Sequence, residues 1–455
     1  MSSARFFFAL AAGKLSSALC KTLAPKRGSN LPGAVALKFD PEFIRHVKGI
    51  DPEKTVVITG TNGKSTSNNM VVHALQTAGR QVCSNLEGAN MKPGAATALV
   101  KNTTAGGRLS KDYLVLEVDE RSLAGVTEDL RPGHLCVVNI QKDQVQRNGD
   151  PDYIYRRIKS VVEKAGGVTL YVNNEEPRSK SLEKYISGGG GRVVSFGVAQ
   201  NARGFTPESE WEVTMPCPLC GDAISFTWYN LAGVGAFMCA ACGFTSGGPA
   251  DCCVTEVDYA AEAFTAEGER YRLSYPAEFF LYNYALCLSV SLELGLAVDE
   301  IKKAFETFEN IGGRMESFSY AGKSIKYMRI KQENPETLQS ALDTIAADSS
   351  EKIFILGPAV VDDIVPHYSN TFYTFDCDFG SLIKSGVERF ICFGDTIARD
   401  TANRLRYAGV PDDRIVILDT DDDEKILGAI AACETGNIYL ITWIKKFEKL
   451  KERAG

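Results

Sequence analysis

The chain has 455 residues, of which 44% are hydrophobic and 24% are charged, and its formal net charge at neutral pH is −7. This composition is typical of a globular protein, and the length predicts two or three domains. The acidic balance counts against non-specific binding of nucleic acid, which usually requires a basic surface, but not against a small anionic substrate.

The first residues carry a helical pattern of apolar positions. The run that begins at Phe6 imitates a short secretory signal, but Lys14 interrupts it, and the run falls short of the about 20 apolar residues that span a membrane. We therefore expect no transmembrane segment and a helical arm over residues 1–50. In this arm an amphipathic helix is followed by a connection at Leu31-Pro32-Gly33 that leads to the first strand.

Most of the 13 cysteines stand alone in apolar runs, as Cys136 and Cys392 do. A reduced thiol packs in such a run as a small hydrophobic side chain, whereas disulfides belong mainly to secreted proteins. The cysteine pattern therefore predicts a reducing, cytoplasmic location.

From Thr55 onward, short apolar strands alternate with amphipathic helices, which predicts a mainly parallel α/β sheet. Ligands of such sheets bind at the carboxyl ends of the strands. The predicted elements are strand 55–59, helix 64–78, strands 113–118 and 134–139, helix 152–165, strand 168–172, and helices 277–295 and 298–308.

A second α/β series begins after Gly312-Gly313-Arg314 and predicts a smaller, Rossmann-like domain with its own sheet. Its elements are strands 352–357 and 388–393, helix 396–408, strand 414–418, helix 423–433 and strand 438–442. We therefore expect a central domain over residues 51–312 and a C-terminal domain over residues 313–455.

The most informative motif is the turn Thr59–Thr66, with the sequence TGTNGKST, directly after an apolar strand. Glycines in such a turn let backbone N–H groups surround phosphate oxygens, the lysine adds a mobile cation, and a following hydroxyl can bind Mg²⁺. The residues that we expect to bind a nucleotide are Gly60, Thr61, Asn62, Gly63, Lys64, Ser65 and Thr66.

This turn departs from the strict P-loop pattern, because Ile58 stands where that pattern has its first glycine. The turn is therefore a shortened variant of a phosphate-binding loop. The alternative is an ordinary turn between a strand and a helix, with an exposed lysine.

Three acidic residues, Glu117, Asp119 and Glu120, stand at the end of strand 113–118. Alternation along a strand puts Glu117 and Asp119 on one face, at the sheet edge where the loop also lies. A triphosphate site needs a hard oxygen ligand for Mg²⁺, and we expect one of these carboxylates to provide it. Solvated carboxylates at a strand end are the alternative.

Two C-x₂-C pairs, Cys217 with Cys220 and Cys239 with Cys242, are separated by 18 residues. The spacing lets both thiolates of a pair point at one ion, and four thiolates complete a tetrahedral shell around Zn²⁺. A closed shell of this kind is normally structural, so we expect a zinc ribbon inserted at about residues 211–247. A redox-active dithiol and an iron centre are the alternatives.

In this order along the chain, several motifs resemble the ATP-site motifs of the Mur ligase family. They are Thr59–Thr66, Glu117, Asn139 with Asp143-Gln144, Tyr282-Asn283-Tyr284-Ala285, and Gly312-Gly313-Arg314-Met315-Glu316. The resemblance spans most of the chain. The Cys₄ insertion, the opening Gly13-Lys14 and the segment 394–409 resemble the branch of the family that forms synthetase subunits of lipid II isoglutaminyl synthases.

The resemblance implies that ATP phosphorylates the α-carboxylate of D-glutamate in the stem peptide of lipid II, and that ammonia displaces the phosphate to give D-isoglutamine. Lys64 and the loop amides would hold the phosphates, and the hydroxyl of Ser65 or Thr66 with Glu117 would hold Mg²⁺. By motif position, Asn283 would face the adenine and Arg314 the ribose or the phosphates. A lipid-linked substrate leaves open a place at the inner face of the membrane.

The chain has no evident source of ammonia. Glutamine hydrolysis by a class I amidotransferase needs a cysteine nucleophile with a histidine base, and none of the four histidines has such a context. The resemblance implies a separate GatD-like glutamine amidotransferase subunit, whose triad is completed by an aspartate of this chain. The best match is Asp376, with Asp378, Asp362 and Asp363 as alternatives.

Departures from the family pattern concern the partner and the C-terminal domain more than ATP, among them a stretch between Leu356 and Asp376 that is longer than the usual motif. Glu333 precedes Asn-Pro where a lysine is expected, and Gln146 replaces an aspartate. One competing hypothesis is an amino-acid-adding Mur ligase or folylpolyglutamate-type ligase, against which the Cys₄ insertion and the C-terminal motif count. The other is a zinc-ribbon ATPase or adaptor that binds nucleic acid, against which the acidic net charge counts.

Overall fold

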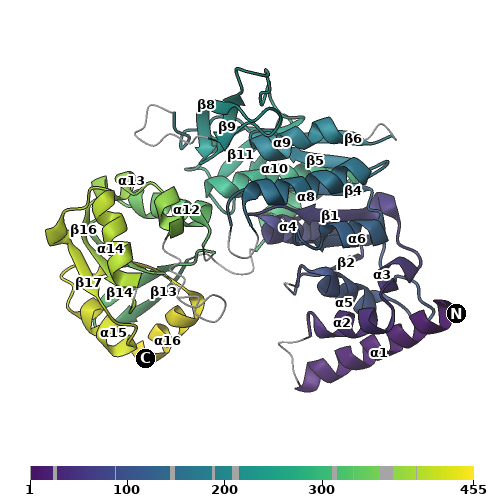
Figure 1. The fold of residues 1–455 in the computed structure, drawn as a ribbon, viewed down its shortest axis with the longest axis horizontal. Coiled ribbons are helices and arrows are strands. Elements are labelled where there is room, and N and C mark those ends of the chain that lie inside the picture. The colour runs from purple at the N-terminus through teal and green to yellow at the C-terminus, as the bar shows by residue number, and fades with distance from the viewer. Residues whose placement is uncertain are drawn as a thin grey trace. The chain divides into compact units, whose positions relative to one another are not determined.

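The computed structural model of the chain contains two compact units (Figure 1). Unit 1 comprises Met1–Gln141 and Asp150–Asn310, and unit 2 comprises Lys142–Gly149 and Ile311–Gly455. The residues that the structure describes are 2–23, 28–87, 89–143, 149–186, 190–206, 215–309, 315–331, 333–358, 372–395 and 397–455.

A sheet of nine strands, counted over the described residues, forms the centre of unit 1. Its order is β12-β11-β10-β6-β5-β4-β1-β3-β2, and neighbouring strands are parallel except β10-β11 and β11-β12. The predicted α/β fold with a mainly parallel sheet is thus confirmed. The bounds are β1 Thr55–Thr59, β2 Val82–Ser84, β3 Tyr113–Glu117, β4 His134–Val137, β5 Thr169–Asn173, β6 Arg192–Val198, β10 Cys252–Asp258, β11 Ala263–Ala266 and β12 Glu269–Arg272.

Helices cover both faces of this sheet (Figure 1). Val56 and Ile58 of β1 pack in one core, and Val57 packs in a second core on the opposite face. Burial on both faces explains why the strand is an unbroken apolar run. The helices of unit 1 after the N-terminal arm are η2 Pro52–Lys54, α4 Lys64–Thr77, α5 Lys92–Asn102, α6 Leu123–Leu130, α8 Pro151–Lys164, α9 Pro177–Ser181, η3 Leu182–Tyr185, α10 Glu278–Glu293 and α11 Val298–Thr307.

The N-terminal arm is helical and belongs to unit 1. The expected connection at Leu31-Pro32-Gly33 is wrong, because these residues form the first turn of a helix. Proline is tolerated there, since its missing N–H would have no partner within the helix. A Cβ on Gly33 would lie 2.0 Å from the carbonyl oxygen of Pro93 in α5, so glycine permits the close approach. The helices of the arm are α1 Ser2–Leu23, α2 Leu31–Phe39 and α3 Phe43–His46.

A three-stranded antiparallel ribbon lies between β6 and β10 in the sequence. Phe226, Tyr229 and Phe237 form its small core together with Cys217 and Cys239. A core of this size provides little burial, so an additional crosslink would stabilise the ribbon. The strands are β7 Met215–Pro216, β8 Ala223–Leu231 and β9 Val234–Met238.

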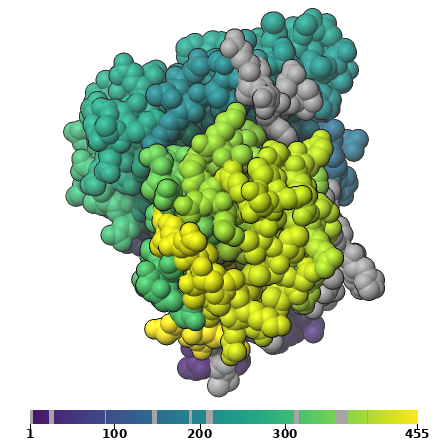
Figure 2. Space-filling view, turned by 90° about the vertical axis from the view of Figure 1, so that its left-hand side faces the viewer, coloured from purple at the N-terminus to yellow at the C-terminus, as the bar shows by residue number. Residues whose placement is uncertain are grey.

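Unit 2 has its own sheet, in the order β13-β14-β18-β15-β16-β17, and is drawn in green to yellow from residue 315 onward (Figure 1 and Figure 2). Only β13-β14 is antiparallel among its described neighbours. The strands are β13 Met315–Tyr320, β14 Lys323–Met328, β15 Lys352–Gly357, β16 Val387–Phe393, β17 Ile415–Leu418 and β18 Asn437–Thr442. The helices are α12 Pro335–Ala346, η4 Phe372–Asp376, α13 Gly380–Lys384, α14 Ile397–Tyr407, η5 Asp412–Arg414, α15 Asp423–Ala431 and α16 Ile444–Ala454.

Candidate functional site

The loop after β1 has the backbone geometry of an anion site. Gly60 and Gly63 have φ angles of +123° and +84°, which favour glycine. A Cβ at Gly60 would lie 2.7 Å from the carbonyl oxygen of Asn139, and one at Gly63 would lie 2.4 Å from Oδ1 of Asn283. Gly63 also leaves the first turn of α4 without a side-chain cap. The N–H groups of such a turn have no partners within the helix and attract phosphate oxygens.

The end of β4 holds this loop in place. The N–H groups of Thr61 and Asn62 donate to the backbone and side-chain oxygens of Asn139, each at 2.8 Å. The amide side chains of Asn62 and Gln141 are bonded at 3.1 Å, and the N–H of Gln141 donates to the hydroxyl of Thr61 at 2.9 Å. The sequence marked this strand end as polar but did not show that it supports the loop.

Lys64 lies buried at the loop, with 7% of the residue exposed. Its ammonium donates to Oε1 of Glu120 at 2.7 Å and also contacts the carbonyl oxygens of Gly60 and Thr61. The cation is therefore held next to the loop amides before any phosphate binds. Glu120 is a site residue that the sequence did not separate from its two acidic neighbours.

Ser65 and Glu117 meet as a hydroxyl–carboxylate pair. The hydroxyl of Ser65 donates to Oε2 of Glu117 at 2.7 Å, and Asn90 donates to Oε1 of the same carboxylate at 2.9 Å. Asn85 fixes the backbone of Glu117 through two further hydrogen bonds, at 2.8 and 3.0 Å. A hydroxyl and a carboxylate are hard oxygen donors of the kind that Mg²⁺ prefers. The residues present at this point therefore fit the metal of a triphosphate site.

Asp119 has a different environment. Arg121 donates to both of its carboxylate oxygens, at 2.9 and 3.1 Å. Burial opposes ionisation of Asp119, but the hydrogen bonds and the charge of Arg121 outweigh it and lower the pKa of the carboxyl group. Asp119 is thus an ionised partner of Arg121, and Glu117 is the carboxylate that contacts a loop hydroxyl.

Asn283 lies in α10, directly beneath the loop. It is 1% exposed, and its Oδ1 accepts a hydrogen bond from the hydroxyl of Ser67 in α4 at 3.0 Å. Its Nδ2 is buried and has no hydrogen-bond partner among the described residues. The structure thus brings Asn283 to the phosphate loop. Arg314 lies outside the described residues.

The four cysteines of the ribbon form one cluster. Their sulfur atoms all lie within 4.8 Å of one another, with Cys217 and Cys242 at 3.7 Å and Cys220 and Cys239 at 3.5 Å. Zn–S bonds of about 2.3 Å in a tetrahedron separate the sulfurs by about 3.8 Å. Four sulfurs at this spacing therefore fit a zinc ion.

Asp376 ends η4 in unit 2, with 37% of its side chain exposed. The ammonium of Lys142 donates to its two carboxylate oxygens at 3.0 and 2.8 Å. Asp378 instead accepts a backbone N–H two residues further on, at 2.7 Å, which is a turn-forming role. Asp362 and Asp363 lie outside the described residues.

A second polar cluster in unit 2 surrounds the start of α12. Asn334 caps this helix and donates to Oδ1 of Asp143 at 3.2 Å, and Lys331 pairs with the other oxygen of Asp143. Burial raises the pKa of Glu336 to about 8, and the negative charge of Asp143 acts in the same direction. Glu333, which replaces the expected lysine, has a φ of +57°, a strained value for a residue with a side chain.

Two sequence models of protein families match the chain. The Mur ligase middle domain matches residues 58–216, and the MurT ligase C-terminal domain matches residues 332–444. The subunit MurT of the glutamine-hydrolysing lipid II isoglutaminyl synthase of Staphylococcus aureus strain COL is 29% identical over 386 residues, which cover 85% of this chain and 84% of that protein. Residues 58–216 thus match a Mur ligase domain, and MurT subunits are homologues of the chain over most of its length.

Other relatives agree with these matches. The MurT subunit of Streptococcus pneumoniae strain ATCC BAA-255 / R6 is 27% identical to this chain over 433 residues, covering 91% of the chain and 90% of that protein. The structure of a pseudomurein peptide ligase type C from Methanothermus fervidus has a TM-score of 0.64 at 17% identity, covering 91% and 81% of the two chains. MurF from Acinetobacter baumannii has a TM-score of 0.61 at 13% identity, covering 92% and 80%. The two structures show a shared fold.

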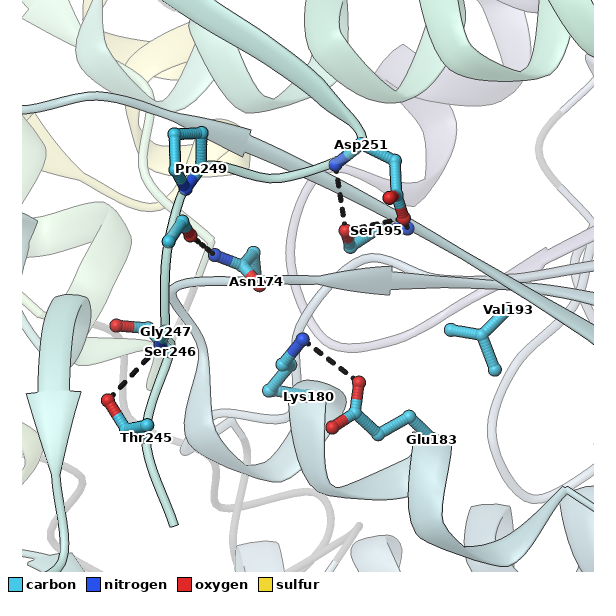
Figure 3. Close-up of a pocket in the computed structure, with 11 residues that line it drawn as sticks. Asn174, Lys180, Glu183, Val193, Ser195, Thr245, Ser246, Gly247, Pro249 and Asp251 are labelled. Carbon is cyan, nitrogen blue, oxygen red and sulfur yellow. Dashed lines mark hydrogen bonds and ion pairs between the residues drawn. The ribbon is translucent and has the colours of Figure 1, made fainter. Parts of the chain in front are cut away.

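Unit 1 also has a polar pocket of about 460 Å³ beside the segment that follows the ribbon (Figure 3). Lys180 pairs there with Glu183 at 2.9 Å, and Asp251 accepts hydrogen bonds from the N–H and the hydroxyl of Ser195, each at 2.8 Å. These polar groups satisfy one another, and the pocket is lined by none of the loop residues. We therefore assign it no part in the site.

Proposed function

We propose that this chain is a Mur ligase-type protein, the ATP-dependent synthetase subunit of a lipid II isoglutaminyl synthase. The reaction converts the α-carboxylate of D-glutamate in the stem peptide of lipid II to an amide, which gives D-isoglutamine. The observation that carries the proposal is the joint presence of the phosphate loop, with Lys64 and the Ser65–Glu117 pair, and a MurT-type C-terminal domain. Relatives that cover most of the chain bear the name of this enzyme.

The chemistry requires activation, because a carboxylate oxygen is a poor leaving group. Transfer of the γ-phosphoryl group of ATP to the carboxylate gives an acyl phosphate and ADP. Ammonia then attacks the carbonyl carbon, inorganic phosphate leaves with the electrons of the broken C–O bond, and the nitrogen loses a proton. The protein has to hold the two reactants in line and stabilise the charge on the transferred group.

The residues at the loop suit this task. The loop amides and the first turn of α4 would hold the β- and γ-phosphates, and the ammonium of Lys64 would exchange Glu120 for phosphate oxygens. Ser65 and Glu117 would hold Mg²⁺, which neutralises phosphate charge when bound. These groups already lie together at the loop, so ATP binding would exchange their present contacts for contacts with phosphate and Mg²⁺.

We assign the remaining nucleotide contacts by motif position. Asn283 would contact the adenine, and its buried Nδ2 can donate a hydrogen bond. Arg314 is the residue for the ribose or the phosphates. The Ser67 contact of Asn283 shows that this side chain also supports the loop, so its substitution should weaken ATP binding by both routes.

The ammonia would come from a GatD-like glutamine amidotransferase subunit. Within the described residues no cysteine is hydrogen-bonded to a histidine, and burial raises the pKa of Cys377, beside Asp376, well above its ordinary value. Such a thiol is not a nucleophile. Asp376 would orient the histidine of the partner's triad, and its carboxylate is exposed enough to be reached. Lys142 would hold that carboxylate in position.

The zinc that we propose for the ribbon is structural. A Cys₄ shell leaves no open coordination position for a substrate, and the ribbon core is too small to be stable without a crosslink. We place the protein in the cytoplasm, where the thiols stay reduced and where ATP is available.

Reconstitution with the amidotransferase subunit tests the function. The complex is incubated with lipid II, ATP, Mg²⁺ and glutamine, and mass spectrometry follows the exchange of a hydroxyl group for an amino group on D-glutamate. Parallel reactions contain ammonium or single amino acids instead of glutamine. We expect the amide with glutamine and with ammonium. Addition of an amino acid would identify an amino-acid-adding ligase, and ATP consumption without any product on lipid II would exclude this substrate.

A further inference from the structure

The N-terminal helix α1 has two apolar faces, of which unit 1 buries only one. The buried face consists of Phe6, Ala9, Leu10, Gly13, Ser17 and Cys20, which recur with the spacing of one helix face. The opposite face consists of Ala4, Phe8, Ala11, Leu15, Ala18 and Leu19, at similar intervals. At about 100° per residue, the two sets form opposite stripes along the helix.

The large side chains of the outer stripe are exposed. Phe8, Leu15 and Leu19 are 59%, 64% and 50% exposed. Phe8 also stacks edge to face on exposed Phe39 at the end of α2, at 4.8 Å between ring centroids, so the apolar surface continues onto the next helix. Of the twelve large hydrophobic side chains that are exposed among the described residues, six lie in α1 and α2. We call the surface of Phe7, Phe8, Leu15, Leu19, Leu31 and Phe39 the arm patch.

The stretch of chain that carries the arm patch has charged side chains of one sign. The first 39 residues contain six lysines and arginines and no aspartate or glutamate, so the remaining 416 residues carry a formal charge of −13 within the total of −7. On α1, Lys14 and Lys21 flank the outer stripe on one side and Arg5 flanks it on the other, as their positions around the helix require. An apolar ridge between basic side chains matches the boundary between acyl chains and anionic headgroups.

We propose that the arm patch lies in the surface of an anionic phospholipid membrane. Phe8, Leu15 and Leu19 would enter the acyl boundary, and Lys14, Lys21 and Arg5 would contact lipid phosphates. A second copy of the chain fits less well, because a symmetric contact through this patch would bring two sets of basic residues together. The proposal goes beyond the proposed function and does not require lipid II, but it would place the active site at the surface where a lipid-linked substrate is found.

Co-sedimentation of the full chain with vesicles tests the proposal. We expect binding to vesicles that contain phosphatidylglycerol, weaker binding at high salt, and little binding to pure phosphatidylcholine. The vesicles contain no lipid II, so failure of the proposed function would not change the result. Failure of the wild-type chain to bind the anionic vesicles would overturn the proposal.

Two pairs of substitutions assign the binding to the arm patch. Phe8→Asp with Leu15→Asp should weaken vesicle binding at least about tenfold, and so should Lys14→Glu with Lys21→Glu. The control for the apolar pair is Met238→Asp, at an exposed apolar position of the ribbon. The control for the basic pair is Lys303→Glu with Lys449→Glu, at exposed positions. Both control variants should bind the vesicles as the wild type does. Equal binding by wild type and arm variants would overturn the proposal.

A reporter variant covers the case in which an aspartate perturbs the helix. Phe8→Trp keeps an aromatic ring at the position, and its fluorescence should shift to the blue when anionic vesicles are added. An unshifted spectrum in the presence of bound vesicles would show that α1 stays in water and would overturn the proposal. Size-exclusion chromatography tests the alternative that the patch binds a second copy of the chain. If the wild type were a dimer and the Phe8→Asp with Leu15→Asp variant a monomer, the patch would be a dimer contact and the proposal would be overturned.

Discussion

Replacing Lys64 by methionine should stop ATP-dependent amidation and also destabilise unit 1, for two different reasons. Lys64 and Glu120 form an ion pair at 2.7 Å, and each side chain is 8% exposed. Methionine keeps the length of the side chain but removes its charge, so the carboxylate of Glu120 stays buried without its cation. Breaking a buried pair in this way typically costs about 3–5 kcal/mol, and we expect the free energy of unfolding to fall by about that amount.

The loss of activity comes from the reaction and not from the fold. A fixed positive charge at the transferred phosphoryl group is worth about 10³–10⁵-fold in rate. We therefore expect the turnover of Lys64→Met to fall at least about 10³-fold at saturating ATP. The assay measures initial rates on lipid II with ammonium as the nitrogen source, so that the amidotransferase subunit does not limit the rate. Urea unfolding gives the stability of the same preparations.

The double variant Lys64→Met with Glu120→Gln separates the two effects. Removing the orphaned charge should restore most of the unfolding free energy and none of the activity. Lys302→Met is the matched control, because Lys302 pairs with Glu269 at 2.6 Å in unit 1 but lies outside the loop. Turnover of Lys64→Met within about tenfold of the wild type would refute the assignment of the loop to phosphate. Recovery of activity in the double variant would refute the role of the charge itself.

Three further outcomes follow from other parts of the chain. Cys239→Ser should lower the bound zinc from about one ion per chain to none by elemental analysis, and zinc at the wild-type level would exclude the Cys₄ site. Asp376→Asn in the complex should reduce glutamine-driven turnover at least about 10²-fold while ammonium-driven turnover persists, and equal losses would place Asp376 at the synthetase site. Burial raises the pKa of Glu175 from 4.5 to about 7, so the folded state keeps a proton that the unfolded state loses near pH 4.5. Stability should then fall by up to about 1.4 kcal/mol per pH unit as the pH rises from 4.5 to 7, and this slope should be smaller in Glu175→Gln; equal slopes in urea unfolding would contradict the shift.

The main sheet elements of both units could be predicted because their residues are apolar with a regular period. The predicted strand 352–357 has the bounds of β15, and the predicted helix 64–78 ends one residue beyond α4. The predictions omitted β10, which begins at Cys252 in a stretch whose cysteine and glycine content resembles the ribbon. They also omitted the hairpin β13-β14. Its turn places Ala321 at a φ of +49°, and an alanine in the sequence does not predict a turn with a positive φ.

The contacts of the site depended on register, which the sequence does not contain. Ile58 of β1 lies opposite Glu117 of the parallel strand β3, and this pairing brings the acidic strand end to the start of the loop. The position of Glu117 at the end of a predicted strand, in the order of the family's motifs, was enough to predict that it belongs to the site. The ion pair of Lys64 with Glu120 could be identified only from the adjacent strands of the structure. The same is true of the hydrogen bonds from Asn85 and Asn90 to Glu117.

The polar run after β4 shows most clearly what sequence patterns leave undecided. Four residues within five positions have side chains that could serve one site: Asn139, Gln141, Lys142 and Asp143. Their place at a strand end would assign all four to one edge of the sheet. In the structure Asn139 and Gln141 hold the phosphate loop of unit 1, whereas the next residues, Lys142 and Asp143, hold Asp376 and Asn334 of unit 2. Adjacent positions of one polar run therefore hold residues of different units, and the residue types alone do not tell which position serves which unit.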